Sequence, residues 1–181
     1  FSEPIKSTSS ISGGCIADSR KLQFESGKVY FLKQLRGSSP GGFDAEEAGL
    51  KELRKSSTVN VPEVVRKGPD FLLLQWIEEG FSRTSSSMEM LGIQFAEMHR
   101  FRGKKFGFSE DNYLGGSPQL NKPSKEGSQN WAVFYAENRL EIQTSLAVKN
   151  GYATSELRNL MENLIKKFPD YISGTEEEPS L

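Results

Sequence analysis

Alternating apolar and polar positions in the first half of the chain predict a small antiparallel sheet with one helix. The segments Leu22–Phe24 and Val29–Leu32 flank a polar turn that contains glycine, which is typical of a β-hairpin. Val61–Val65 and Phe71–Ile77 flank a second turn of this kind and are expected to form two more strands. Between the two pairs, the apolar spacing over Phe43–Lys55 predicts a helix.

The second half of the chain predicts helices separated by one long irregular segment. Apolar residues recur at helical spacing over Met88–Arg100, and the chain closes with two more expected helices, Trp131–Asn150 and Thr154–Lys167. The segment Gly103–Gln129 is rich in Gly, Pro and Asn, and a loop of that length inside a compact domain is usually functional. We therefore predict an α+β protein with a sheet-containing lobe over residues 1–80 and a helical lobe over residues 81–181.

Composition narrows the class of protein. The chain has 181 residues, of which 35% are hydrophobic and 26% charged, and this mixture is typical of a folded globular protein. The net charge of −1 argues against nucleic acid as the main partner, because binding phosphates needs an excess of Lys and Arg. One Cys and one His exclude an internal disulfide and a two-histidine metal site. No apolar run reaches the about 20 residues of a membrane-spanning helix, and no signal peptide is visible, so we expect a cytoplasmic protein with no membrane partner.

Three features in the first half gain meaning from their order. Gly13 and Gly14 form a glycine turn, Lys33 ends a strongly apolar strand, and Glu46 lies on the following helix. Each alone is most often structural: a plain turn, a solvated strand end, a surface carboxylate. Together they follow the order of kinase-like phosphotransferases, in which the Lys holds nucleotide phosphates and the helix Glu holds the Lys. Glu47 is the neighbouring alternative to Glu46.

The segment Gln75-Trp76-Ile77, which follows the last predicted strand, fits the place of an adenine-binding hinge in that order. Backbone groups of such a hinge bind the base. The sequence has no G-x-x-x-x-G-K-[ST] motif, so a P-loop does not compete with this interpretation.

With these features the sequence resembles the fructosamine (ketosamine) kinases over nearly the whole chain, from about Ser12 to Leu181. In the first half the resemblance is carried by Gly13–Ile16, Tyr30–Lys33 and Phe43–Leu50. In the second half it is carried by Leu91-Gly92, Glu97–His99, the run Phe106–Gln119, Trp131, Phe134, Arg139-Leu140 and Gln143. The run has the pattern F-G-F-x-x-D-N-x-x-G-x-x-P-Q, which general kinase folds lack, and it is the most discriminating part.

The resemblance implies ATP-dependent phosphorylation of a sugar hydroxyl on a fructosamine or a glycated protein lysine, an activity regarded as deglycation repair. It implies a protein-kinase-like, two-lobe fold, with ATP and Mg²⁺ required. Lys33 would bind phosphates, Glu46 would pair with it, Gly13 and Gly14 would shape the phosphate loop, and Gln75, Trp76 and Ile77 would form the hinge. Asp111 and Asn112 are candidates for substrate contact or for shaping their loop, since Asp and Asn are also common turn residues.

No catalytic residue of the family's pattern stands in these 181 residues. The resemblance places the catalytic H-G-D-x-W loop and the metal ligands just after Leu181, and His99 lies on a predicted helix, away from such a loop. We therefore expect an N-terminal fragment that does not transfer phosphate. Two alternatives stay open: a non-catalytic nucleotide-binding or scaffold protein, and a small-molecule kinase of the aminoglycoside or choline kinase type.

Cys15, in the glycine turn, has two interpretations. It is either a small residue tolerated in a turn or a redox-sensitive thiol whose oxidation links two chains. A homodimer is expected either through Cys15 or through apolar surface that the absent part of the protein leaves exposed.

Overall fold

The computed structural model describes residues 3–12, 17–37, 43–78, 80, 83–115, 117–172 and 178–180. The chain divides into two compact units, Phe1–His99 and Arg100–Leu181. The helix that ends at His99 therefore belongs with the first unit, whereas the division at residue 80 expected from the sequence places it with the second.

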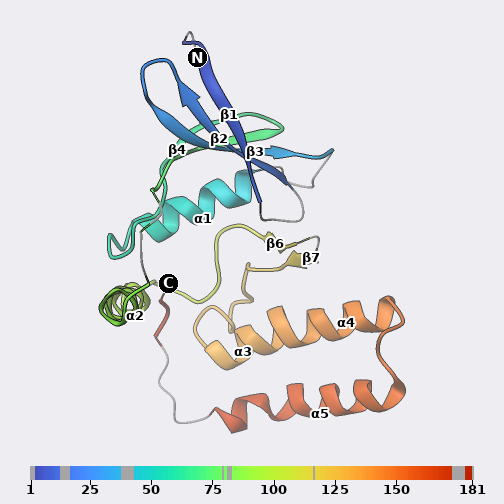
Figure 1. Ribbon diagram of the computed structural model, residues 1–181. Coiled ribbons are helices and arrows are strands. Elements are labelled where there is room, and N and C mark those ends of the chain that lie inside the picture. The colour runs from blue at the N-terminus through green and yellow to red at the C-terminus, as the bar shows by residue number, and fades with distance from the viewer. Residues whose placement is uncertain are drawn as a thin grey trace. The chain divides into compact units, whose positions relative to one another are not determined.

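The first unit is built on a five-stranded antiparallel sheet (Figure 1). Its strands are β1 (Ile5–Ile11), β2 (Ala17–Phe24), β3 (Val29–Leu35), β4 (Val64–Lys67) and β5 (Phe71–Gln75), in the spatial order β1-β2-β3-β5-β4. Both predicted hairpins are present as β2–β3 and β4–β5.

Four details of the sheet differ from the prediction. Strand β1 was not predicted, because it is an edge strand whose mostly exposed side chains give no apolar alternation. Strand β3 runs on to Leu35, so Lys33 lies inside the strand, paired with β2 on one side and β5 on the other. Strand β4 begins at Val64, after Pro62, which has no backbone N–H to donate to a ladder. Strand β5 ends at Gln75, so Trp76 and Ile77 lie beyond it.

Each face of this sheet has its own apolar cluster, because Leu72, Leu73 and Leu74 alternate between the faces. Leu73 packs with Leu22 and Phe24 on one face. On the other face Leu72 and Leu74 pack with Phe43, which precedes helix α1 (Asp44–Arg54). Helix α1 runs along that face (Figure 1) and corresponds to the predicted helix.

Helix α2 (Ser85–His99) begins with a reciprocal cap between Thr84 and Ser87, each side chain accepting the other's backbone N–H at 3.1 and 3.0 Å. It contains one buried residue, Met98. Its exposed large apolar residues are Met88, Met90, Leu91, Ile93 and Phe95. Among the described helices, none has the length and apolar character needed to span a membrane.

The second unit combines a short hairpin with a helical layer. The strands β6 (Asn112–Leu114) and β7 (Ser117–Gln119) pair within the segment predicted to be irregular. The predicted helix Trp131–Asn150 is present as α3 (Trp131–Tyr135), a π-helical turn η1 (Ala136–Glu141) and α4 (Ile142–Lys149). The last helix, α5 (Ser155–Tyr171), extends past the predicted end at Lys167 and contains Pro169 in its final turn.

Candidate functional site

Lys33 and Glu46 form an ion pair between the central strand β3 and helix α1. The Lys33 Nζ donates hydrogen bonds to both carboxylate oxygens of Glu46, at 2.7 and 2.6 Å. Both side chains are half-buried, and Nζ lies 5.8 Å from the centre of the Phe43 ring. The carboxylate thus fixes the direction of an ammonium that would otherwise move on a flexible stem.

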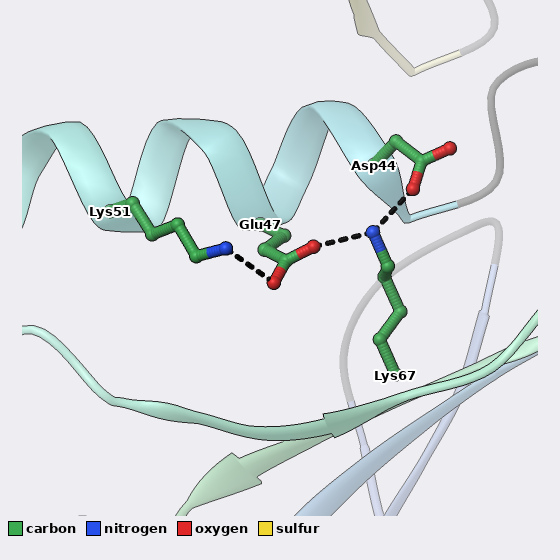
Figure 2. Close-up of polar contacts among 4 residues, drawn as sticks. All are labelled: Asp44, Glu47, Lys51 and Lys67. Carbon is green, nitrogen blue, oxygen red and sulfur yellow. Dashed lines mark hydrogen bonds and ion pairs between the residues drawn. The ribbon is translucent and has the colours of Figure 1, made fainter.

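Glu47, the alternative partner, faces a different lysine. Lys67 on β4 contacts the carboxylates of Asp44 and Glu47, and Lys51 binds Glu47 from the next turn of α1 at 2.7 Å (Figure 2). Hydrogen bonds from Lys51 and then Lys67 lower the pKa of Glu47, and bonds to Asp44 and Glu47 raise the pKa of Lys67. The helix therefore offers Glu46 to β3 and Glu47 to β4.

An apolar cavity of about 280 Å³ lies in the first unit. Its lining residues are Ile11, Phe31, Pro62, Leu74, Gln75, Trp76 and Ile77. Phe31 and Lys33 are two positions apart on β3, so their side chains leave the same face of the sheet. The cavity walls and the Lys33–Glu46 pair thus share one face, and all three predicted hinge residues line the cavity.

Three polar groups lie in the wall of this cavity or close to it. The backbone N–H of Gln75 already donates to the Glu63 carbonyl at 2.8 Å. The indole Nε1 of Trp76 is buried and finds no hydrogen-bond partner within the described part of the chain. The Nζ of Lys21 lies 4.3 Å from the centre of the Trp76 ring, in cation–π geometry.

The predicted glycine turn and its cysteine lie outside the described residues: Gly13, Gly14 and Cys15. Their roles as phosphate loop and redox thiol stay predictions. Ile11, at the end of β1, is the described residue of the cavity wall that lies nearest to them along the chain.

In the second unit, Asp111 is occupied by its own loop. Its Oδ1 accepts hydrogen bonds from the backbone N–H groups of Asn121, at 2.7 Å, and Lys122, at 3.2 Å. Asn112 is the first residue of β6 and pairs with Gln119. Both residues thus shape the loop, and substrate contact by either stays a prediction.

Asn121 and Arg139 were not among the predicted site residues, yet they organise this loop. Asn121 is 5% exposed and its Nδ2 donates to the Glu110 carbonyl at 3.1 Å. Arg139 donates to the Leu120 carbonyl and to Asn121 Oδ1, both at 2.7 Å, and burial lowers the pKa of its guanidinium. The sequence signal for Arg139 was its place in the family pattern, and Asn121 had none.

A second cavity, of about 650 Å³, lies between α4 and α5. Its walls carry both signs of charge, and its lining includes Glu141, Lys149, Arg158, Glu162 and Lys166. None of the predicted site residues that the structure describes lines it. Among the described residues, no group of three or more His, Cys, Asp or Glu side chains lies close enough to hold a metal ion.

Comparison with known proteins identifies the family. The sequence model of the family described as fructosamine kinase matches residues 2–181. Protein-ribulosamine 3-kinase, chloroplastic, from Arabidopsis thaliana is 31% identical over 184 residues, covering 98% of this chain and 54% of the relative. A candidate ketoamine kinase from Enterococcus faecium is 35% identical over 139 residues, covering 75% of this chain and 46% of the relative.

The fold comparison agrees. The crystal structure of a candidate fructosamine-3-kinase from Thermobifida fusca YX-ER1 matches with a TM-score of 0.85 at 26% identity, covering 98% of this chain and 61% of that one. This confirms the predicted α+β, protein-kinase-like fold class. The chain spans about half the length of the curated relatives it matches. With the family model matched over residues 2–181, the chain belongs to the fructosamine kinase family.

Proposed function

We propose that the first unit binds ATP and that the chain is the nucleotide-binding part of a kinase acting on ketoamines. The observation that carries this proposal is the Lys33–Glu46 pair beside an apolar cavity on the same face of the sheet. A cation held in place next to a base-sized apolar cavity suits a molecule with phosphates at one end and a flat ring at the other.

In this proposal Lys33 binds the α- and β-phosphates, and Glu46 aims it. A lysine is a compact point charge on a flexible chain, so its contribution depends on a partner that fixes its direction. The bidentate contact of Lys33 with Glu46 supports that division of roles.

The base would lie in the cavity that Phe31, Trp76 and Ile77 help to line. The backbone N–H of Gln75 already donates to the Glu63 carbonyl. In this proposal the backbone groups of Trp76 and Ile77 therefore form the hydrogen bonds between the hinge and the base. Gln75 would then contribute to the wall of the cavity. ATP binding implies Mg²⁺, and among the described residues no group of three or more His, Cys, Asp or Glu side chains could hold it.

The acceptor we propose is a sugar hydroxyl of a ketoamine on a glycated amine or protein lysine. The hydroxyl oxygen attacks the γ-phosphorus, the bond to ADP breaks, and the hydroxyl proton passes to a base. The names of the Arabidopsis and Enterococcus relatives support this class of acceptor. The 181 residues contain no H-G-D sequence to supply the base, so we expect this chain alone to bind ATP without turnover.

Nucleotide binding is tested by titration calorimetry on the 181-residue chain. We expect Lys33→Met to weaken ATP binding about tenfold or more, the usual cost of losing a charged hydrogen bond, while adenosine binding stays unchanged. Lys55→Met is the matched control, because Lys55 also pairs with a glutamate of α1, Glu52, at 2.6 Å. Equal ATP affinity in both variants would contradict the proposal.

Turnover is tested by ³¹P NMR with ATP and fructosyl-lysine or ribulosyl-lysine. The 181-residue chain is expected to give no phosphorylated product, and product formation would show that its own residues complete the site. The longest natural chain containing these residues is expected to phosphorylate the ketoamines but not an aminoglycoside or choline. ATP binding without phosphorylation of any of them would favour the non-catalytic alternative.

A further inference from the structure

We infer that Lys67 is a positioning residue for the Lys33–Glu46 pair: by holding Asp44 and Glu47 it fixes the first turns of α1 and keeps Glu46 within reach of Lys33. The effect of Lys67 on ATP binding rests on the proposed function. The effect of Lys67 on the position of Lys33 rests on the geometry of the first unit alone.

Lys33 and Lys67 lie in one row across the sheet. Both pair with Leu72, Lys33 from β3 and Lys67 from β4. Residues directly opposite one another on neighbouring strands leave the same face, and Leu72 packs against Phe43 on the face that α1 covers. The row therefore presents a lysine, a fully buried leucine and a second lysine to the start of α1.

A register shift in β4 is what brings Lys67 to this face. Val64 packs on the face that α1 covers, and Lys67 lies three positions further along the strand. In a regular strand, residues three positions apart point to opposite faces, so Lys67 would face away from α1. The register shift between Val64 and Arg66 adds one residue to β4, as a β-bulge does, so Lys67 points to the same face as Val64.

The first turns of helix α1 depend on such anchors. A further polar attachment of the helix, from Arg54 to the Val61 carbonyl at 2.7 Å, lies in its last turn. All eleven of its residues are described, and none is fully buried. Phe43 at its N-cap has no polar side chain with which to cap the first turn. Apolar contact to the core comes from Phe43 and Leu50.

The two lysines anchor different sides of the helix. Glu46 and Glu47 are consecutive, so they point about 100° apart around the helix axis. Lys33 binds Glu46. Lys67 binds both Glu47 and Asp44 (Figure 2). Two anchors on different sides fix the rotation of α1 as well as its distance from the sheet. Without Lys67, the three carboxylates in the first turn of α1, those of Asp44, Glu46 and Glu47, would face a row across the sheet in which Lys33 is the one remaining lysine.

The test measures Lys33 directly, by its rate of acylation in the folded chain, followed by mass spectrometry and normalised to Lys28 in the exposed β2–β3 turn. We expect Lys67→Met to raise the Lys33 rate roughly threefold, the size of effect that partly exposed ion pairs produce. Lys67→Arg should restore the original rate, because arginine can still bridge two carboxylates. Lys55→Met should leave it unchanged.

A double variant shows whether Lys67 acts through Glu46. Glu46→Gln alone should also raise the Lys33 rate, and adding Lys67→Met to it should have no further effect, since contacting residues are not additive. Thermal unfolding of each variant confirms that labelling is done on the folded protein. An unchanged Lys33 rate in Lys67→Met, or full additivity with Glu46→Gln, would overturn the inference.

Nucleotide titration separates this inference from the proposed function. We expect Lys67→Met to weaken ATP binding less than Lys33→Met does, and adenosine binding to stay constant in both. If Lys33→Met leaves ATP binding intact, the proposed function fails while the labelling result still decides the role of Lys67.

Discussion

Asn121 is the residue around which the most discriminating motif of the chain is built. Asp111 binds the backbone N–H of Asn121, the Asn121 side chain binds the Glu110 carbonyl, and Arg139 holds its Oδ1. The backbone N–H of Phe108 donates to the Asn121 carbonyl at 2.8 Å. The F-G-F and D-N parts of the motif thus meet at one buried asparagine, which gives the motif a structural reason.

Gly107 supplies the first residue-scale prediction. Its φ is +83°, and an added Cβ would press on the Asn121 carbonyl oxygen and the Phe134 ring. We expect Gly107→Ala to destabilise the protein by about 2–4 kcal/mol, from left-handed strain plus overpacking. Gly151→Ala is the control: φ there is +72° with nothing near the added carbon, so about 1 kcal/mol is expected. Urea unfolding measures both, and equal losses would contradict the packing explanation.

Glu47 supplies a pH-dependent prediction. Its pKa is held below its ordinary value, near 4.5, so the stabilisation it gives is complete above that value and is lost as the pH falls through the lowered pKa. Glu47→Gln should therefore be less stable than the wild type at pH 7, and the difference should shrink as the pH falls from 5 toward 3. Urea midpoints at several pH values check this, and a constant difference would mean that the carboxylate charge is not responsible.

The contact between Lys33 and Glu46 follows from the order of elements along the chain, and this is why the sequence could suggest it. Lys67 could not be found in this way. The partners of Lys67 lie 20 and 23 residues earlier in the chain. The face of the sheet to which Lys67 points depends on a register shift in β4, which the sequence pattern does not predict.

At the scale of elements, the sequence predicted best where apolar residues recur at the period of a strand or a helix. The hairpins β2–β3 and β4–β5 and the helices α1 and α5 have apolar positions at the correct period. The strands β1, β6 and β7 are short or exposed, so backbone pairing alone defines them. The π turn η1 could not be predicted from the sequence either. Its buried residue Asn138 donates hydrogen bonds to the Leu120 and Lys122 carbonyls, and contacts between distant segments leave no local sequence pattern.

Helix α2 makes an element-scale prediction, because it exposes apolar side chains along its length. Leu91 and Phe95 are 48% and 51% exposed and lie one helical turn apart. We expect the 181-residue chain to self-associate, and Leu91→Ser with Phe95→Ser to weaken that association about tenfold or more, given the apolar area removed.

Sedimentation equilibrium measures this association, and Glu97→Ser, on the same helix and also exposed, is the control. If the double variant associates as strongly as the control, the association surface lies elsewhere. Cys15→Ser under non-reducing conditions then tests the other predicted contact between chains.

For the whole molecule, the candidate chemistry is unevenly distributed between the two units. The ion pair, the apolar cavity and the proposed hinge all belong to the unit ending at His99. In the second unit the predicted residues Asp111 and Asn112 mainly build their own loop. Nucleotide binding is therefore the part of the proposed activity that the described residues best support.

The π turn between α3 and α4 has a consequence for the tolerance of the chain to length changes. A π turn holds one residue more than the α-helical path, so deleting one residue within Ala136–Glu141 would allow a continuous α-helix. Because the extra residue is contained within one turn, removing it leaves α4 facing the same way relative to α3. A deletion within α4 has no extra residue to remove, so every side chain after it would rotate by about 100° around the helix axis. Val148, which lies in the cavity wall between α4 and α5, would then point elsewhere. We therefore expect a one-residue deletion within Ala136–Glu141 to be tolerated better than one within Ile142–Lys149.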